Sequence, residues 1–200
     1  MKSIILGTVA AFALSATAAV AAPTVGEPAP AFSAVDTAGK TRALSEFKGK
    51  TVVLEWTNDG CPYVKKHYGA GNMQKLQQEA TAGGTVWLTI ISSAPGKQGY
   101  VDAAAANQLT TSRGAKPTAV LLDPKGDVGR AYEAQTTPHM FVIDKAGTLR
   151  YMGAIDDQPT TEAASLPNAR NYVREALAAV GSGGKVAQTT TDPYGCSVKY

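Results

Sequence analysis

The sequence contains one almost uninterrupted apolar run, Thr-Val-Trp-Leu-Thr-Ile-Ile at residues 85–91. Such a run is typical of a β-strand that is buried on both faces. Further strand patterns lie at residues 51–56, 118–122 and 140–143, and helical patterns separate them. Because a strand buried on both faces needs cover on each side, the sequence predicts an α/β fold, with a central mixed β-sheet flanked by helices.

Turn-forming residues set the expected ends of the other elements. Residues 31–36 and 42–47 are expected to pair as an N-terminal β-hairpin, and residues 140–143 and 148–152 as a second hairpin. A helix is expected to begin at Pro62, with a kink at Gly69 or Gly71. The other expected helices are residues 98–112, residues 128–133, and a last helix with its N-cap at Asn168 that ends at Gly181.

The first 22 residues resemble a secretory signal. Lys2 provides the charged start, residues 4–13 the apolar stretch, and Ala19-Val20-Ala21 the cleavage pattern. Cleavage after Ala21 leaves a chain that suits one compact domain, which we expect at residues 23–180. A flexible tail is expected at residues 181–200, because it begins with a Gly-Ser-Gly-Gly segment.

The charge and the cysteine content narrow the function classes. Removing Lys2 with the signal lowers the net charge from +3 to +2, and the basic residues are dispersed. We therefore expect neither nucleic-acid binding nor membrane attachment. An export signal together with two cysteines predicts an exported, oxidising location, with the periplasm as the expected compartment.

Cys61 lies at the junction between the strand at residues 51–56 and the helix that begins at Pro62. Unpaired N–H groups and the positive end of the helix dipole stabilise a thiolate at such a position. Lys65, one helical turn later, is expected to lower the pKa of this thiol further. Cys61 is therefore predicted to be a reactive nucleophile; the alternative is a buried structural cysteine or one half of a stabilising disulfide.

The second cysteine, Cys196, lies near the end of the chain, and Val64 stands where a Cys-x-x-Cys motif would carry its second sulfur. Any disulfide must therefore join distant parts of the sequence. We predict that Cys196 is a resolving thiol carried on the flexible tail. A purely structural disulfide is the alternative, because closing so long a loop stabilises a domain by about 4 to 5 kcal/mol.

Four segments together resemble the redoxin branch of the thioredoxin-like superfamily, which includes the AhpC/TSA proteins, the peroxiredoxin-like proteins and the exported TlpA-type thioredoxins. They are residues 26–32, residues 44–50, residues 52–62 and Thr136-Thr137-Pro138. The resemblance covers roughly residues 25–180 and implies a thioredoxin-like fold. It also implies a nucleophile at Cys61, with a cis proline packed beside it at Pro138.

The resemblance implies roles for Thr137 and Glu55, and the positions of Trp56 and Tyr63 on either side of Cys61 suggest another. Thr137 is expected to present its backbone to an incoming thiol or extended chain, unless Pro138 is a trans proline that begins a strand. Glu55 is expected to be a buried acid that takes a proton from a thiol, or else an edge-strand carboxylate in solvent. Trp56 and Tyr63 are expected to form an apolar rim for a partner, or else to be core packing.

The implied activity is that of an exported thiol–disulfide oxidoreductase that needs no bound cofactor. Its expected partners are a thioredoxin-like dithiol donor and a thiol, disulfide or peroxide substrate. An antioxidant peroxidase reaction would use the same two cysteines. The peroxiredoxin pattern Pro-x-x-x-Thr-x-x-Cys is absent, however, because Leu54 and Asn58 replace its proline and threonine. We therefore expect slow turnover of peroxide or none.

A non-catalytic alternative is a binding module or copper chaperone in which a Cys61–Cys196 disulfide is structural. Cysteine and histidine are ligands for soft metals, and His67 and His139 are the two histidines of the chain. Six residues along a helix correspond to about 240° of rotation, which places His67 away from the face of Cys61. The sequence therefore does not predict a metal site.

Overall fold

The computed structural model describes residues 22–200, so the expected secretory signal lies outside the described residues apart from Ala22. The strands are β1 (Ser33–Asp36), β2 (Thr41–Ala43), β3 (Val52–Trp56), β4 (Val86–Ile91), β5 (Ala119–Leu122), β6 (Thr136–Thr137), β7 (His139–Ile143), β8 (Leu149–Gly153) and β9 (Cys196–Ser197). The helices are α1 (Pro62–Gly69), α2 (Asn72–Ala82), α3 (Ala103–Ser112), α4 (Asp127–Ala131) and α5 (Tyr172–Gly181), with 3-10 helices η1 (Leu44–Phe47) and η2 (Ala163–Asn168).

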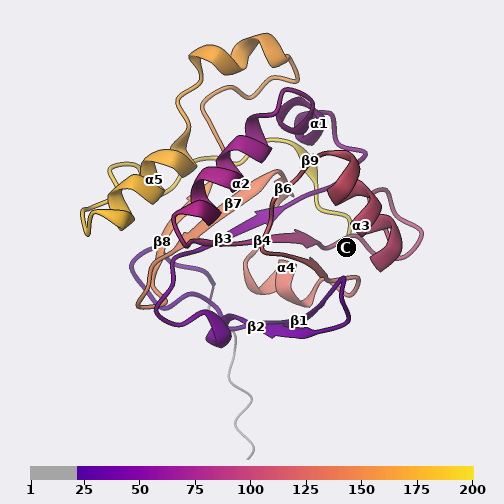
Figure 1. Ribbon diagram of the computed structural model, residues 1–200, viewed down its shortest axis with the longest axis horizontal. Helices are drawn as coiled ribbons and strands as arrows, with labels where there is room; N and C mark the ends of the chain where they lie inside the picture. The colour runs from indigo at the N-terminus through magenta and orange to yellow at the C-terminus, as the bar shows by residue number, and fades with distance from the viewer. Residues whose placement is uncertain (1–21) are drawn as a thin grey trace, which may run out of the picture.

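Seven strands form a central mixed sheet in the order β2-β1-β5-β4-β3-β7-β8 (Figure 1). β3, β4 and β5 are parallel, and β7 runs antiparallel to β3. The apolar run at residues 85–91 becomes β4, which is buried along its whole length between β3 and β5. The expected fold class, a mixed sheet flanked by helices, is therefore confirmed.

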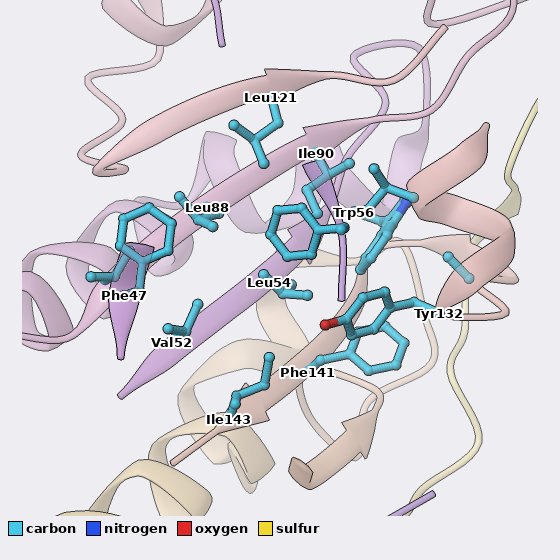
Figure 2. Packing of buried hydrophobic residues seen from close by; sticks show 14 of the residues in the cluster. Phe47, Val52, Leu54, Trp56, Leu88, Ile90, Leu121, Tyr132, Phe141 and Ile143 are labelled. Carbon is cyan, nitrogen blue, oxygen red and sulfur yellow. The ribbon is translucent and has the colours of Figure 1, made fainter. Parts of the chain in front are cut away.

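The alternation of side chains along β3 divides the core into two layers. Val52, Leu54 and Trp56 face one layer, which α4, η1 and the N-terminal segment cover (Figure 2). Val53 faces the other layer, in which α1, α2 and α5 pack against the sheet. Cys61, at the start of α1, belongs to this second layer. The strand register therefore decides which β3 side chains lie on the same face of the sheet as Cys61.

Several element boundaries differ from the sequence expectations. The second half of the N-terminal hairpin is only β2, because residues 44–47 form η1, where the Glu46 side chain accepts a hydrogen bond from the Ala43 N–H at 2.8 Å. The expected kinked helix is two helices, separated at Gly71, whose φ of 71° lies in the left-handed region. The expected helix at residues 98–112 begins only at Ala103, because Asp102 caps it.

The expected N-cap of the last helix was wrong. Asn168 ends the 3-10 helix η2, and Asn171 caps α5 by accepting a hydrogen bond from the Arg174 N–H at 2.8 Å. Both asparagines satisfy the same sequence rule, since each precedes the apolar face of the helix. The backbone bridge between Asp156 and Asn171, which joins distant segments, is not visible in local sequence.

The C-terminal tail lies against the domain in this structure (yellow in Figure 1). β9 pairs antiparallel with β6, outside the seven-stranded sheet. Beyond β9, the Lys199 carbonyl accepts a hydrogen bond from the Ala94 N–H at 2.8 Å, and the Tyr200 hydroxyl donates to the Ala134 carbonyl at 2.9 Å. The flexibility expected of the tail stays a prediction. Among residues 22–200, no helix has the length and apolarity needed to cross a bilayer.

Candidate functional site

Cys61 is the N-cap residue of α1, with extended backbone angles and Pro62 in the first turn. The loop from β3 positions it, because Asn58 folds the chain back: its Oδ1 accepts the Gly60 N–H at 2.8 Å and its carbonyl accepts the Cys61 N–H at 3.1 Å. The side chain of Cys61 is buried, with 0% of its surface exposed. The predicted position at the strand-to-helix junction is therefore what the structure shows.

Two backbone groups contact the Cys61 sulfur. As a thiol, its Sγ donates to the Thr137 carbonyl at 3.0 Å, and the Cys196 N–H points at the same sulfur at 3.4 Å. Thr137 and Cys196 are directly paired in the β6–β9 ladder. The peptide bond between Thr137 and Pro138 is cis, in agreement with the prediction. Three segments that are distant in sequence therefore meet at one sulfur.

The pKa of Cys61 is lower than the ordinary value of a cysteine. Burial acts in the opposite direction and raises the pKa of this thiol. Hydrogen bonds from the Cys196 thiol, the Val64 N–H and the Thr137 side chain outweigh burial, because they stabilise the thiolate. Cys61 is therefore the sulfur that ionises more readily.

The pKa of Cys196 is shifted in the opposite direction from that of Cys61. Cys196 is half-buried, and both cysteines are free thiols. Burial, its hydrogen bond to Cys61 and the negative charge of Cys61 raise the pKa of Cys196 to about 11. The two thiols lie within hydrogen-bonding reach of each other, and the pKa of Cys61 is lowered while that of Cys196 is raised.

The role expected of Lys65 is not supported. Its side chain is exposed, while the hydrogen bonds that lower the pKa of Cys61 come from Cys196, Val64 and Thr137. The buried lysine of α1 is Lys66, at 4% exposure, whose Nζ donates to the Gln158 carbonyl at 2.7 Å. The prediction for Lys65 rested on its position four residues after Cys61, and this spacing does not show whether the side chain points to the sulfur or to solvent.

A polar cluster that sequence reasoning missed, with three buried members and the half-buried Tyr194, packs in the same core layer as the two cysteines. We call it the Tyr194 cluster: Lys66, His67, Asp156 and Tyr194. The Tyr194 hydroxyl donates to the Asp156 carboxylate, and His67 Nε2 and Lys66 Nζ lie 3.1 and 3.5 Å from the same oxygen. Lys66 also lies 5.1 Å from the centre of the Tyr194 ring. The cluster joins the tail to α1 and to the loop after β8.

The protonation state of His67 follows from its partners. Its Nδ1 faces the Asn72 amide nitrogen at 2.8 Å, so Nδ1 accepts and Nε2 carries the proton that is donated to Tyr194. Burial and the charge of Lys66 lower the pKa of His67 to about 3. His67 is therefore neutral near pH 7. The sequence signal for the cluster was the change from a Gly- and Thr-rich tail to Asp-Pro-Tyr-Gly-Cys at residues 192–196.

Glu55 lies on the Cys61 side of the sheet and is fully buried, so the solvent-exposed alternative is excluded. Its carboxylate accepts four hydrogen bonds, at 2.7 to 3.1 Å, from the side chains of Tyr68, Gln77, Trp87 and Thr89. All four donors come from α1, α2 and β4, and none is a sulfur. Glu55 therefore links the helices to the sheet under the site, and its proton-transfer role stays a prediction.

Trp56 does not contribute to a rim around Cys61. It is 0% exposed and faces the opposite core layer, where its ring packs 5.2 Å from that of Phe141 and its indole N–H donates to Ser92 at 3.0 Å (Figure 2). The strand alternation that puts Glu55 under the site puts Trp56 away from it. Tyr63 is half-buried beside the site, with its ring 5.6 Å from that of Tyr194.

His139 is buried in β7, and burial lowers its pKa to about 3. Its Nδ1 accepts the Gln135 N–H at 3.2 Å, so this ring serves the turn before β6. Within the described part of the chain, no group of three or more His, Cys, Asp or Glu residues is placed to hold a metal ion. The copper-site interpretation therefore has no geometric support from these residues.

Comparison with solved structures identifies the fold. An uncharacterized conserved protein from Geobacillus kaustophilus is 23% identical, with a TM-score of 0.74 over 88% of this chain and 92% of that chain. A hypothetical protein from Sinorhizobium meliloti 1021 is 24% identical, with a TM-score of 0.75 over 88% and 94%. The thioredoxin domain of a thiol-disulfide oxidoreductase from Bacteroides vulgatus is 21% identical, with a TM-score of 0.50 over 63% and 85%. These likenesses support a thioredoxin-like fold.

No curated protein matches the sequence. The AhpC/TSA family model matches residues 25–152, which is more than half of the chain and includes Cys61 and Pro138. The predicted resemblance to the redoxin branch is therefore confirmed, and the chain belongs to the AhpC/TSA family.

Proposed function

We propose that this protein is a thiol–disulfide oxidoreductase in which Cys61 is the nucleophile and Cys196 the resolving thiol. One observation supports this most directly: the Cys196 N–H points at the Cys61 sulfur, and the two thiols have pKa values shifted in opposite directions. A pair of this kind has a defined order of attack, because the thiolate is the attacking form.

In the first step the Cys61 thiolate attacks one sulfur of a substrate disulfide. A bond forms between Cys61 and that sulfur, the substrate disulfide breaks, and the leaving thiolate takes a proton from solvent. The positive end of the α1 dipole and the hydrogen bonds at Cys61 favour the thiolate form of the attacking sulfur. The product is a mixed disulfide between Cys61 and the substrate.

In the second step Cys196 loses its proton and attacks the Cys61 sulfur; the bond between Cys61 and the substrate breaks, and the leaving substrate thiolate takes up a proton. The charge of the Cys61 thiolate is one cause of the raised pKa of Cys196, and this charge disappears once Cys61 is in a mixed disulfide. Cys196 therefore becomes easier to deprotonate when it is needed. The substrate gains two electrons and the protein loses two as the Cys61–Cys196 disulfide forms.

A dithiol donor, of the thioredoxin-like kind expected from the sequence, completes the cycle. Cys196 is the more accessible sulfur, since it is half-buried while Cys61 is buried. Attack on Cys196 also releases Cys61, which is the better leaving group because its pKa is lower. The donor is therefore expected to attack Cys196. No bound cofactor takes part in these steps.

Peroxide is the less favoured oxidant. A peroxide would convert Cys61 to a sulfenic acid, which Cys196 would then condense with to give the same disulfide and water. The positions of the peroxiredoxin proline and threonine are occupied by Leu54, in the core, and Asn58, whose amide is bonded to Gly60 and to Gln98. Neither residue is free to orient a peroxide.

Turnover assays with three proteins test the proposal. Wild type, Cys61→Ser and Cys196→Ser are each mixed with a low-molecular-weight disulfide and a thioredoxin-type donor, and substrate reduction is followed. We expect turnover only in the wild type, a trapped mixed disulfide in Cys196→Ser, and no reaction in Cys61→Ser. Equal rates in all three proteins would refute the proposal. Hydrogen peroxide in the same assay should be consumed slowly; fast Cys61-dependent consumption would instead assign a peroxidase.

One observation favours the non-catalytic alternative, a binding module with a structural disulfide: Cys61 is 0% exposed while the tail lies over it. Such a module would form the Cys61–Cys196 bond once and resist its reduction in the folded state. The assay separates the two functions, because a disulfide that no dithiol donor reduces supports the binding module.

We also infer that the protein is exported to the periplasm, from the charged start, apolar stretch and small-residue cleavage pattern of its first residues. Mass spectrometry of the protein from fractionated cells tests this. A mature chain that begins at Ala22 in the exported fraction supports the inference, and a chain that retains Met1 in the cytosol contradicts it.

A further inference from the structure

β6 has β9 as its one strand partner among residues 22–200. In this pairing Thr137 lies opposite Cys196 and Thr136 opposite Ser197. The Thr137 carbonyl also accepts a hydrogen bond from the Cys61 thiol, at an S–O distance of 3.0 Å. Any extended segment that pairs with β6 in this register therefore places the N–H of its central residue at the Cys61 sulfur, as the Cys196 N–H is at 3.4 Å.

A set of side-chain contacts to Tyr194 accompanies this edge. Tyr194 and Cys196, on either side of the bend at Gly195, both pack against the core layer that contains Cys61. The Tyr194 ring packs 5.6 Å from the ring of Tyr63, and its hydroxyl meets Asp156 and His67 in the Tyr194 cluster. These contacts therefore fit an aromatic ring that carries a hydroxyl and lies close to the cysteine in sequence.

The position between Tyr194 and Cys196 requires a glycine. Gly195 has a φ of 136°, and a Cβ atom at this position would overlap the carbonyl oxygen of Thr137. A residue with a side chain would push the strand away from β6. The edge therefore fits the sequence Tyr-Gly-Cys, which the chain carries at residues 194–196.

The proposed function requires a substrate to reach Cys61. In the structure the C-terminal tail lies in front of this sulfur, paired with β6. Resting on that function, we propose that the β6 edge and the residues that contact Tyr194 form a docking site for an extended polypeptide with a tyrosine two residues before its cysteine. The tail of the chain occupies the site as a built-in competitor. A polypeptide substrate then reaches Cys61 only while the tail is undocked.

Alkylation kinetics of the reduced, full-length protein test the competitor. Iodoacetamide labelling at Cys61 and at Cys196 is followed separately by peptide mass spectrometry in wild type and Tyr194→Phe. The substitution keeps the ring and removes the hydroxyl that contacts Asp156 and His67, so docking weakens. We expect Cys61 labelling to become about tenfold faster, as for the loss of one hydrogen bond to a charged group.

Tyr100→Phe is the matched control, because Tyr100 is 42% exposed and its substitution removes a hydroxyl that is not part of the Tyr194 cluster. Its Cys61 labelling rate should equal that of wild type. Gly195→Ala is a second variant that displaces β9 by a different cause, and it should also increase the rate. Fluorescence of the buried Trp56 and Trp87 verifies that each variant is folded. Unchanged Cys61 rates in folded Tyr194→Phe and Gly195→Ala would overturn the proposal.

A peptide tests the docking site itself. The probe is a synthetic copy of residues 192–200 with Cys196→Ser, and its comparison peptide also carries Tyr194→Ala. Added to the Tyr194→Phe protein, the first peptide should bind and slow Cys61 labelling, and the second should not. Equal protection by both peptides, or by neither, would contradict the proposal. Neither readout needs disulfide turnover, so an inactive wild type would refute the proposed function and leave the docking site intact.

Discussion

At the scale of single residues, the reactivity assigned to Cys61 depends on hydrogen bonds more than on neighbouring charge. Burial raises the pKa of this thiol, and bonds that include one from Thr137 reverse the effect. Thr137→Val removes that hydroxyl and should raise the pKa of Cys61, whereas Lys65→Gln should leave it unchanged because Lys65 is exposed. Thiolate absorbance during a pH titration measures the pKa of Cys61 in both variants. If this pKa rises only in Lys65→Gln, Lys65 has the role predicted from sequence.

Glu55 gives a second prediction at this scale. Its carboxylate accepts four side-chain hydrogen bonds in the core, and the NH2 group of an amide in its place would face a donor, either Tyr68 at one oxygen position or Trp87 at the other. Glu55→Gln should therefore lower the free energy of unfolding by about 2 to 4 kcal/mol. Glu162→Gln, on the surface, is the control and should change it by less than about 0.5 kcal/mol. Urea denaturation measures both, and equal midpoints would show that Glu55 is not structural.

At the scale of elements, the last helix tests a capping assignment. Asn171 caps α5 with a 2.8 Å hydrogen bond to the Arg174 N–H, while Asn168 lies at the end of η2. Asn171→Ala should cost about 1 kcal/mol of stability. Asn168→Ala should cost less than about 0.5 kcal/mol. Thermal unfolding of the two variants distinguishes the caps, and the reverse order would support the boundary expected from sequence.

The elements that sequence predicted are those with a strong local signal. β4 follows from a continuous apolar run, and α1 from Pro62 in its first turn. The errors occur where two local solutions are nearly equal, as between Asn168 and Asn171, and a backbone bridge to Asp156 decides between them. The separation of α1 from α2 had a signal in Gly71, but the sequence did not show whether a kink or a break would result.

At the scale of the molecule, the two buried histidines predict how stability depends on pH. Burial lowers the pKa of His139 to about 3, and burial with the charge of Lys66 does the same for His67. The unfolded chain therefore binds more protons than the folded one between about pH 6.5 and pH 3. Above this window the buried histidines do not reduce the free energy of unfolding. As the pH decreases through the window, the free energy of unfolding falls, by roughly 2 kcal/mol per histidine at pH 5.

Urea midpoints at pH 7.5 and pH 5 measure this dependence. His139→Asn keeps an acceptor near the position of Nδ1 and removes one titrating group, so about half of the pH dependence should disappear. A wild-type midpoint that is the same at both pH values would show that the histidines are not buried as neutral rings.

The candidate site was predictable only in part, for a reason of topology. Cys61 and Pro138 were identified because each has a local pattern that the family resemblance reinforces. The Tyr194 cluster was missed because its members come from α1, the loop after β8 and the tail, and no single segment shows that they meet. The rim role predicted for Trp56 was wrong because closeness in sequence did not bring it close to the site. Adjacent residues of one strand face opposite layers, so Trp56 faces away from Cys61.

A redox titration of the wild-type protein tests the central claim most directly. The protein is equilibrated in buffers of increasing oxidised-to-reduced dithiothreitol, free thiols are trapped with an alkylating agent, and the masses are measured. The account predicts one reversible two-electron transition in which a peptide containing Cys61 becomes bonded to one containing Cys196. Thiols that stay reduced across the whole range, or a disulfide that the reduced buffer does not open in the folded protein, would contradict it.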